Sequence, residues 1–191
     1  MQATINKSRL ELVEGDITEQ DTEAIVNAAN PSLLGGGGVD GAIHRAAGPE
    51  LLEECRILGG CQTGDAKITK GYRLKAKRVI HTVGPVYFRE GPEQAAELLA
   101  SAYRRSLEAA SENNVRSVSF PSISTGAYGY PMEEAAPIAL QTAINYLGSH
   151  TDIELVRFVL FGQRAYQTYE EALEAILHAR GRRSFAICPA C

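Results

Sequence analysis

The 191-residue sequence has no tryptophan, few cysteines and no long hydrophobic run. No segment approaches the length that a bilayer-spanning helix needs, and the first residues, Met1 to Lys7, contain no apolar core of the kind that a signal peptide carries. Internal repeats and low-complexity linkers are absent as well. These absences predict a single cytoplasmic domain that has no membrane partner.

An excess of charge of one sign is also missing. Nineteen Lys and Arg residues stand against 23 Asp and Glu residues, which gives a formal net charge of −4. A protein that binds the nucleic-acid backbone over a broad surface needs an excess of positive charge. The composition therefore argues against nucleic acid as a partner, and it leaves open only a local basic patch.

The four cysteines do not form the dense pattern of a disulfide-stabilised protein, and a cytosolic setting keeps thiols reduced. Cys188 and Cys191 have the Cys-x-x-Cys spacing of half a zinc site or of a redox pair. A structural zinc ion needs about four ligands, and the sequence offers no second pair of this kind and no Cys-x-x-x-His. We therefore expect no metal, and we interpret this end of the chain as an inert tail.

Apolar runs alternate with helical patterns along the chain. Short apolar or alternating runs predict strands at 8–14, 24–28, 66–69, 78–83, 115–120 and 155–161. Apolar stripes at helical spacing predict helices at 39–47, 50–58, 93–113, 132–147 and 166–180. This alternation predicts an α/β protein with a mostly parallel sheet that is covered on both faces. The domain would extend over residues 1–181, and residues 182–191 form a tail without a period.

In sheets of this type, ligands bind beyond the carboxyl ends of the strands. Four of the predicted strand ends carry polar or glycine-rich segments. These segments are Asn27 to Asn30 with the glycines that follow, Gly84-Pro85, the loop 122–130 and Phe161-Gly162. We expect them to meet at one rim.

Four consecutive glycines, Gly35 to Gly38, lead into a predicted helix that carries Asp40 and His44 one turn apart on the same face. Glycine suits a place where a ligand approaches the backbone closely or where φ is positive. The N–H groups of such a loop and of the helix N-terminus point at anions, above all at phosphate. The stretch therefore predicts a phosphate cradle.

Two familiar phosphate motifs do not fit this loop. The spacing Gly36, Gly38 and Gly41 formally matches the dinucleotide fingerprint, but the acidic residue expected at the end of a following strand is missing. A Walker loop fails because no lysine follows the glycines. The loop must hold phosphate in another frame.

Asp40 and Asn30 each allow two interpretations. A carboxylate exposed at a helix start complements the helix macrodipole, or it lies at the mouth of the cradle and orients or activates a water as general base. Asn30 holds a substrate hydroxyl, or it merely opens a turn, because Asn-Pro commonly begins loops. Residue spacing alone does not choose between these interpretations.

A Ser-His-Asp hydrolase is a further alternative, with Ser124 as the nucleophile and His44 as the base. The segment around Ser124 lacks the Gly-x-Ser-x-Gly elbow, and a histidine on a helix beside Ile43 and Ala47 is more often a packed residue. Both observations count against a triad.

Two aromatic residues lie at the predicted rim. Tyr128 belongs to a glycine-bearing loop where core packing does not easily explain it, so we expect it to stack on a ligand or to cover one. Phe161 ends a strand, where an apolar residue usually belongs to the core.

Six blocks of the sequence, in the family's order over residues 8 to 180, resemble the motifs of a macrodomain of the MacroD type. The blocks are Gly15-Asp16-Ile17-Thr18, Asn27-Ala28-Ala29-Asn30, Gly35 to Gly48, Thr63-Gly64-Asp65-Ala66, His81-Thr82-Val83-Gly84-Pro85 and Pro121 to Pro131. The resemblance implies a three-layer α/β/α sandwich with a central mixed, mostly parallel sheet. It implies binding of ADP-ribose and its esters, deacetylation of O-acetyl-ADP-ribose, and removal of mono-ADP-ribose from acidic residues of proteins.

The resemblance also implies roles for individual residues. Asp16 would accept the adenine amino group beside the Ile17 backbone, with Phe161 stacking on the base. Asn30 and Asp40 would face the distal ribose as catalytic residues, and Asn27 would belong to the substrate-binding set. The diphosphate would lie between two loops, formed by Gly36, Gly37, Gly38 and Val39 and by Ser124, Thr125, Gly126, Ala127 and Tyr128.

The glycine loop contains no insert with Cys and His residues, so the resemblance implies neither a metal nor a cofactor. No lysine lies in either loop, and backbone amides would therefore hold the diphosphate. We accordingly expect a β-branched residue at Gly37 to block the approach of the phosphate. Two other functions stay open, namely a reader that binds ADP-ribose without turnover and an interaction protein that regulates an RNA enzyme. The carboxylate of Asp40 favours the enzyme.

Overall fold

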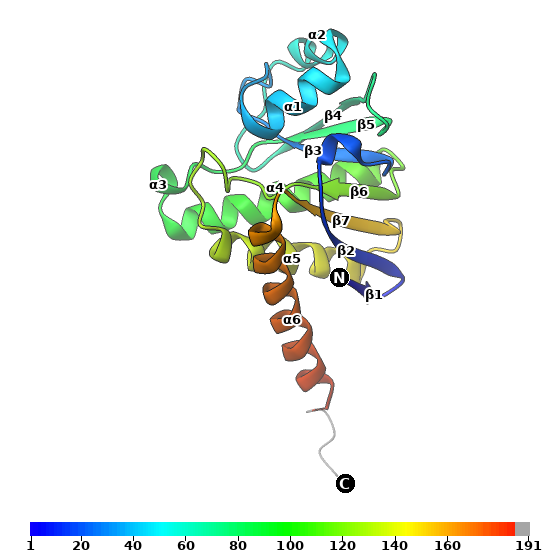
Figure 1. Ribbon diagram of the computed structural model, residues 1–191, viewed down its shortest axis with the longest axis vertical. Helices are drawn as coiled ribbons and strands as arrows, with labels where there is room; N and C mark the ends of the chain where they lie inside the picture. The colour runs from blue at the N-terminus through cyan, green and yellow to red at the C-terminus, as the bar shows by residue number, and fades with distance from the viewer. Residues whose placement is uncertain (186–191) are drawn as a thin grey trace.

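The computed structural model describes the backbone of residues 1–185 and the side chains of residues 1–181. Its strands are β1 (Gln2–Ile5), β2 (Ser8–Glu14), β3 (Ala24–Ala28), β4 (Ala66–Lys70), β5 (Arg78–Thr82), β6 (Ser117–Phe120) and β7 (Leu155–Leu160). They form one seven-stranded sheet in the order β1-β2-β7-β6-β3-β5-β4 (Figure 1). The five central strands are parallel, and the two edge strands run antiparallel to their neighbours.

Helices cover both faces of the sheet. They are α1 (Gly38–Ala47), α2 (Pro49–Leu58), α3 (Tyr87–Glu90), α4 (Pro92–Glu112), α5 (Met132–Ser149) and α6 (Gln163–Phe185), with a 3-10 turn, η1 (Ile17–Glu19). One core lies between the sheet and α4, α5 and α6, and a smaller core lies between the sheet and α1 and α2. Successive residues of a strand serve opposite cores, as Ile25 and Val26 do on β3. The three-layer α/β/α sandwich with a mixed, mostly parallel sheet is confirmed.

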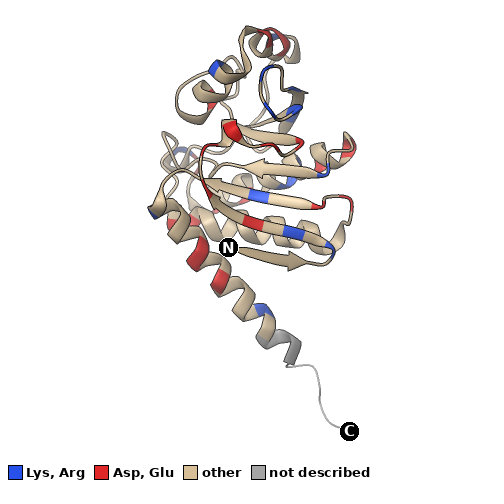
Figure 2. Ribbon diagram, turned by 45° about the vertical axis from the view of Figure 1, so that its right-hand side comes forward, with Lys and Arg blue, Asp and Glu red and all other residues tan. Residues whose placement is uncertain are grey.

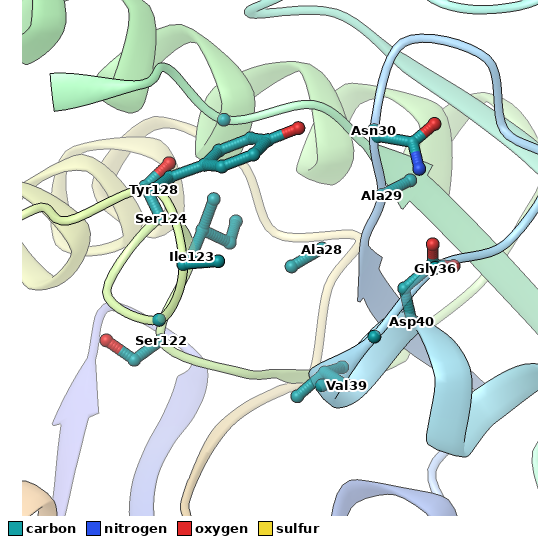
Figure 3. A pocket seen from close by; sticks show the side chains of 15 residues that line it. Ala28, Ala29, Asn30, Gly36, Val39, Asp40, Ser122, Ile123, Ser124 and Tyr128 are labelled. Atoms are coloured by element: carbon teal, nitrogen blue, oxygen red, sulfur yellow. The ribbon is translucent and has the colours of Figure 1, made fainter.

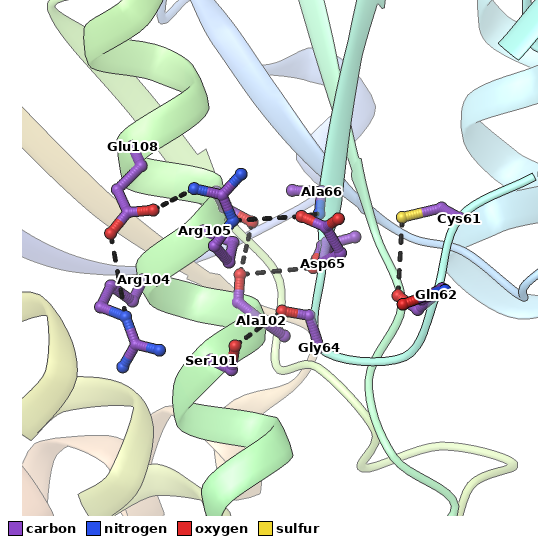
Figure 4. Close-up of polar contacts among 12 residues, drawn as sticks. Cys61, Gln62, Gly64, Asp65, Ala66, Ser101, Ala102, Arg104, Arg105 and Glu108 are labelled. Carbon is purple, nitrogen blue, oxygen red and sulfur yellow. Dashed lines mark hydrogen bonds and ion pairs between the residues drawn. The ribbon is translucent and has the colours of Figure 1, made fainter.

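The segment before β4 is tied to α4 (Figure 4). Ser101 Oγ donates to the carbonyl of Gly64 at 2.8 Å, and Arg105 Nε donates to Asp65 Oδ1 at 3.1 Å. The amide of Gly64 in turn donates to the carbonyl of Val83 at 2.7 Å. These bonds hold the carboxyl end of β5, which brings Gly84 to the same edge of the sheet as the ends of β3 and β6.

Basic and acidic residues both occur along the strands on the face seen in Figure 2. On β2 and β7 they pair: Arg157 Nε donates to Glu11 at 2.9 Å, and Arg9 lies 2.6 Å from the same carboxylate. Arg157 also lies 3.6 Å from Asp21. The basic residues of β2 and β7 are thus each paired with an acidic residue.

The largest differences from the predicted elements lie near the two ends of the chain. The hairpin strand β1 was not predicted, because it is short and its turn rests on a single residue in the left-handed region, Asn6 (φ 56°). The last helix continues past Gly181 to Phe185, because a glycine in a helix costs only about 1 kcal/mol and does not by itself end it. The pair Cys188 and Cys191 lies outside the described residues. None of the helices in the described part of the chain combines the length and the apolar character needed to cross a membrane.

Candidate active site

A cleft of about 270 Å³ opens at the carboxyl ends of β3, β5 and β6 (Figure 3). The predicted rim therefore forms, with three of the four strand ends contributing to the cleft. Its lining consists of Ala28, Ala29, Asn30, Gly36, Gly37, Gly38, Val39, Asp40, Gly84, Ser122, Ile123, Ser124, Gly126, Ala127 and Tyr128.

The first loop of the cleft is shaped by Asn30. Its Nδ2 donates to the carbonyl of Gly35 at 2.8 Å, and its Oδ1 accepts from the amide of Ser32 at 3.0 Å. Gly35 itself has φ 89°, a conformation that residues with a Cβ rarely adopt. Asn30 thus organises the turn and also lines the cleft. One of its two N–H groups remains for a ligand, because an amide nitrogen carries two hydrogens.

Helix α1 begins at this loop, with Gly37 as its N-cap residue. No side chain caps the helix there, because glycine has none to offer. The first N–H groups of a helix have no partner within the helix and favour negative charge. Because residues 36–40 line the cleft, the N-terminus of α1 is positioned to bind an anionic group of a ligand.

Asp40 is buried, with 4% of its surface exposed, and our expectation of an exposed residue was wrong. Its Oδ1 accepts a hydrogen bond from Asn27 Nδ2 at 2.8 Å, whereas its buried Oδ2 has no partner among the described residues. Burial follows from contact with Asn27, thirteen positions away in the sequence, and spacing on one helix could not reveal it. A buried carboxylate oxygen without a partner is unusual in a folded protein and marks a place for a ligand.

Gly36 keeps this carboxylate accessible. A Cβ at that position would lie 3.1 Å from Asp40 Oδ2 and 3.3 Å from Asn30 Nδ2, so a side chain there would crowd both groups. The two polar groups therefore flank a gap that only glycine leaves open (Figure 3). A water molecule or a substrate hydroxyl placed there would contact a carboxylate acceptor and an amide donor together.

The second loop closes the opposite side of the cleft. Ser124 adopts φ 65°, a strained conformation for a residue that is not glycine, and its buried hydroxyl has no partner among the described residues. Gly84 permits this approach, because a Cβ there would lie 2.1 Å from Ser124 Oγ. The side chain of Tyr128 extends from this loop over the cleft (Figure 3). Burial raises the pKa of its phenol, so the hydroxyl stays a neutral hydrogen-bonding group.

The geometry does not form a Ser-His-Asp triad. His44 Nε2 lies 3.4 Å from Asp40 Oδ1 without making a hydrogen bond, and neither this nitrogen nor Ser124 Oγ has a hydrogen-bond partner in the described part of the chain. A nucleophilic serine needs a base within hydrogen-bond reach. The structure thus supports the packed interpretation of His44.

Five of the predicted site residues lie outside the cleft lining, namely Asp16, Ile17, Asn27, Thr125 and Phe161. Asp16 and Phe161 follow the neighbouring strands β2 and β7, whose ends are joined by a bond from the amide of Gly15 to the carbonyl of Leu160 at 2.9 Å. Asp16 is exposed, and Phe161 is 87% exposed instead of belonging to the core. These two side chains therefore extend the rim beyond the cleft.

The other three have partners within the protein. Ile17 is buried at the start of η1, and Asn27 is fully buried beneath Asp40. Thr125 Oγ1 donates to the carbonyl of Ser122 at 3.0 Å. The side chain of Ile17 is thus packed in the core, and those of Asn27 and Thr125 are hydrogen-bonded within the protein.

Sequence reasoning did not single out several residues that belong to the site. Ala28, Ala29, Gly84, Ser122 and Ile123 line the cleft, and all of them lie in the strand-end segments that we expected to meet. Their position after a parallel strand was the signal that could have identified them. In the described part of the chain, no group of three or more His, Cys, Asp or Glu residues is arranged to hold a metal ion.

Comparison with known proteins identifies the family and confirms the fold. The family model described as Macro domain matches residues 26–139. A macro domain-containing protein of Chlorobaculum tepidum is 61% identical over 163 residues, which is 85% of this chain and 94% of that protein. A Salmonella typhimurium protein named O-acetyl-ADP-ribose deacetylase is 52% identical over 170 residues, 87% of this chain and 94% of that one.

Among solved structures, one described as the Oceanobacillus iheyensis macrodomain mutant G37V with ADPR superposes with a TM-score of 0.90. It is 49% identical in sequence, and the superposition covers 93% of this chain and 98% of that one. The family match extends over more than half of the sequence, and the relatives match over nearly their whole length. The chain belongs to the macro domain family.

Proposed function

We propose that this protein binds ADP-ribose and hydrolyses an ester bond at the distal ribose. The observation that carries the proposal is Asp40 Oδ2, a buried acceptor without a partner that lies beside Asn30 at the open N-terminus of α1. A relative named O-acetyl-ADP-ribose deacetylase supports the activity, and a solved relative with ADPR supports the ligand.

The diphosphate would be held by backbone N–H groups. Residues 36–38 precede or begin α1, where the helix dipole favours negative charge, and the loop 124–128 faces them across the cleft. A Cβ at Gly37 would meet nothing within 4 Å inside the protein. The solved relative described as mutant G37V is described with ADPR, and we infer that its mutated glycine corresponds to Gly37; on this inference a β-branched residue at Gly37 does not abolish binding.

The reaction would use the two polar groups beside Gly36. Asp40 would accept a proton from a water molecule as the water oxygen attacks the carbonyl carbon of the ester. The new carbon–oxygen bond forms, the ester bond to the ribose breaks, and the ribose oxygen takes up a proton to leave as a hydroxyl. Asn30 would position the sugar through its remaining N–H group. A single carboxylate thus suffices to move the proton.

The acyl group that leaves as an acid could come from acetate or from a glutamate or aspartate side chain of a protein. Both kinds of substrate carry the same ester linkage, so the same attack of water on the ester carbonyl would release either acid. We therefore propose mono-ADP-ribosylated proteins as substrates alongside O-acetyl-ADP-ribose.

The experiment offers O-acetyl-ADP-ribose and a peptide ADP-ribosylated on glutamate, in parallel, to the purified protein. We expect single-turnover hydrolysis of both, with ADP-ribose released. Tight binding of ADP-ribose, measured by calorimetry, without release of acid from either substrate would contradict the enzyme and support a reader. Hydrolysis of the acetyl ester alone would restrict the substrate class to small acyl groups.

A further inference from the structure

A group of polar side chains lies beneath the cleft without lining it. Asn27 on β3, His81 on β5, Thr69 on β4 and Cys55 on α2 each expose 1% of their surface or less. Buried polar groups are costly unless each finds a hydrogen-bond partner. The arrangement of their hydrogen atoms can therefore be worked out from the contacts.

The assignment of the hydrogen atoms begins at Thr69. Its hydroxyl donates to the carbonyl of Lys70 at 3.1 Å, so its oxygen is free to accept from His81 Nε2, which lies 2.9 Å away. A neutral imidazole carries one hydrogen, and this contact places it on Nε2. Burial lowers the pKa of His81 to about 3, with His44 adding to the effect, so the ring stays neutral under ordinary conditions.

The thiol of Cys55 does not compete for this role. Its Sγ lies 3.7 Å from His81 Nε2, and burial raises the pKa of the thiol to about 11. A protonated thiol is a weak hydrogen-bonding group beside a hydroxyl at 2.9 Å. Thr69 is therefore the partner that selects the tautomer.

With its hydrogen on Nε2, His81 presents a lone pair on Nδ1. Asn27 Nδ2 lies 3.1 Å from this nitrogen and 2.8 Å from Asp40 Oδ1, so its two N–H groups serve both acceptors. Asn27 Oδ1 has no partner among the described residues, and the orientation of the amide thus depends on Nδ2 alone. Turning the amide over would place its oxygen against the carboxylate, which is repulsive.

We propose that His81 and Thr69 are positioning residues for the reaction: through Asn27 they direct Asp40 Oδ1 toward the core and leave Oδ2 for the ligand. Neither residue touches the cleft. The inference rests on the proposed function, because it gives these residues their effect through Asp40. Fixed placement of a reacting group is what such support contributes, and a displacement of about 1 Å can lower a rate about a hundredfold.

Three matched variants test the proposal. Thr69→Val removes the acceptor for His81 Nε2 with little change of shape, whereas Thr69→Ser keeps the hydroxyl. Thr22→Val is the control, because Thr22 is also a buried threonine of the sheet region, 3% exposed, and in the part of the chain that the structure describes its hydroxyl bonds only to Ala24 and Ser119. Melting temperatures establish that each variant folds.

We expect Thr69→Val to lower kcat by about tenfold to a hundredfold while the Kd for ADP-ribose stays unchanged, because Asp40 is misplaced for chemistry and the anion site is intact. Thr69→Ser should recover the rate. A loss of rate in Thr22→Val as large as that in Thr69→Val would overturn the proposal, because the loss would then follow from removing any buried hydroxyl and would not be specific to Thr69.

Nitrogen NMR of the imidazole rings gives a readout that does not need activity. The signals that are missing from the spectrum of His81→Asn are assigned to His81. The ring hydrogen of His81 should reside on Nε2 in the wild type and in Thr69→Ser, and it should move toward Nδ1 in Thr69→Val. A wild-type ring with its hydrogen on Nδ1 would overturn the positioning role even if the enzyme is active. Absence of turnover in the wild type would instead contradict the proposed function, and unchanged kcat in Thr69→Val would overturn the positioning role alone.

Discussion

The two ends of the candidate site differ in how the protein supports them. At the end near Asp40, the carboxylate is 4% exposed and is held by Asn27, which His81 and Thr69 hold in turn. At the end predicted for adenine, Phe161 is 87% exposed. Among the described residues, Asp16 bonds only within its own turn, where the amide of Thr18 donates to its Oδ1 at 2.8 Å and the side chain of Gln20 donates to its carbonyl.

This difference follows from the strands that carry each end. Asn27 and His81 lie on β3 and β5, paired opposite one another in the parallel part of the sheet and enclosed by the second core. Asp16 and Phe161 follow β2 and β7, and both residues are exposed. Chemistry at a defined oxygen atom needs fixed geometry, whereas a flat base can be bound by exposed groups. The comparison predicts that substitutions at the first end affect rate and stability, and that substitutions at the second affect affinity.

The largest expected effect is that of Asp40→Ala on turnover. Removal of a general base costs about a hundredfold to ten-thousandfold in rate, so kcat should fall by that factor with little change in ADP-ribose affinity. Asn30→Ala should show a smaller loss, divided between binding and turnover, because it holds the sugar in both states. Single-turnover hydrolysis alongside calorimetry measures both quantities.

Stability gives a second readout for the same substitution. Because Asp40 is buried, its removal leaves one of the two N–H groups of Asn27 without an acceptor, the other being held by His81, and should cost about 1 to 3 kcal/mol of unfolding free energy. Asp21→Ala, at a carboxylate whose side chain is 84% exposed, is the control and should change neither rate nor stability noticeably. Full activity in Asp40→Ala would remove this residue from the chemistry.

The contrast between the ends also explains what the sequence could reveal. The central strands were predictable because buried parallel strands appear as continuous apolar runs, and the rim followed from the rule for strand ends. The burial of Asp40 depends on Asn27, and the contact of His81 with Thr69 depends on the antiparallel register of β4 and β5, in which Thr69 faces Val79. Such contacts join residues far apart in the sequence, and helical or strand periodicity carries no information about them.

A smaller effect is expected at the open end from Asp16→Ala. Its Oδ2 accepts no hydrogen bond from the described residues, and it would be the atom that accepts from the adenine amino group. The substitution should weaken ADP-ribose binding by about 1 to 3 kcal/mol and reduce the preference over the hypoxanthine analogue, which lacks that amino group. Calorimetry with both nucleotides tests this, and an equal loss for both would contradict it.

The dependence of stability on pH tests the end of the site near Asp40 without any ligand. The folded-state pKa of His81 is about 3, below its ordinary value of 6.5, so the unfolded chain binds the proton first as the pH falls. The contribution of His81 to the free energy of unfolding is therefore fully present above about pH 6.5 and is lost as the pH falls toward 3. At pH 5 the loss is about 2 kcal/mol.

Denaturant unfolding at several pH values measures this decline. His81→Asn, which cannot titrate, should lose this part of the pH dependence, even if it is less stable at neutral pH. His178→Asn, at an exposed histidine of α6, should keep it. Equal pH dependence in the wild type and in His81→Asn would mean that His81 is not held neutral by burial.

The smallest expected effect concerns Phe161, and it distinguishes the two ends most directly. Because this ring is 87% exposed, Phe161→Ala should leave the melting temperature unchanged, unlike any substitution in the group around Asp40. If the ring stacks on adenine, ADP-ribose binding should weaken by about 1 kcal/mol in Phe161→Ala, and Phe161→Tyr should keep the wild-type affinity.

Phe88→Ala is the matched control, because Phe88 on α3 is 85% exposed but does not follow β7. Calorimetry with ADP-ribose and with ribose 5-phosphate separates the contribution of the base from that of the rest of the ligand, because ADP-ribose contains adenine and ribose 5-phosphate does not. A loss of the same size for both ligands, or the same loss in Phe88→Ala, would show that Phe161 does not recognise the base.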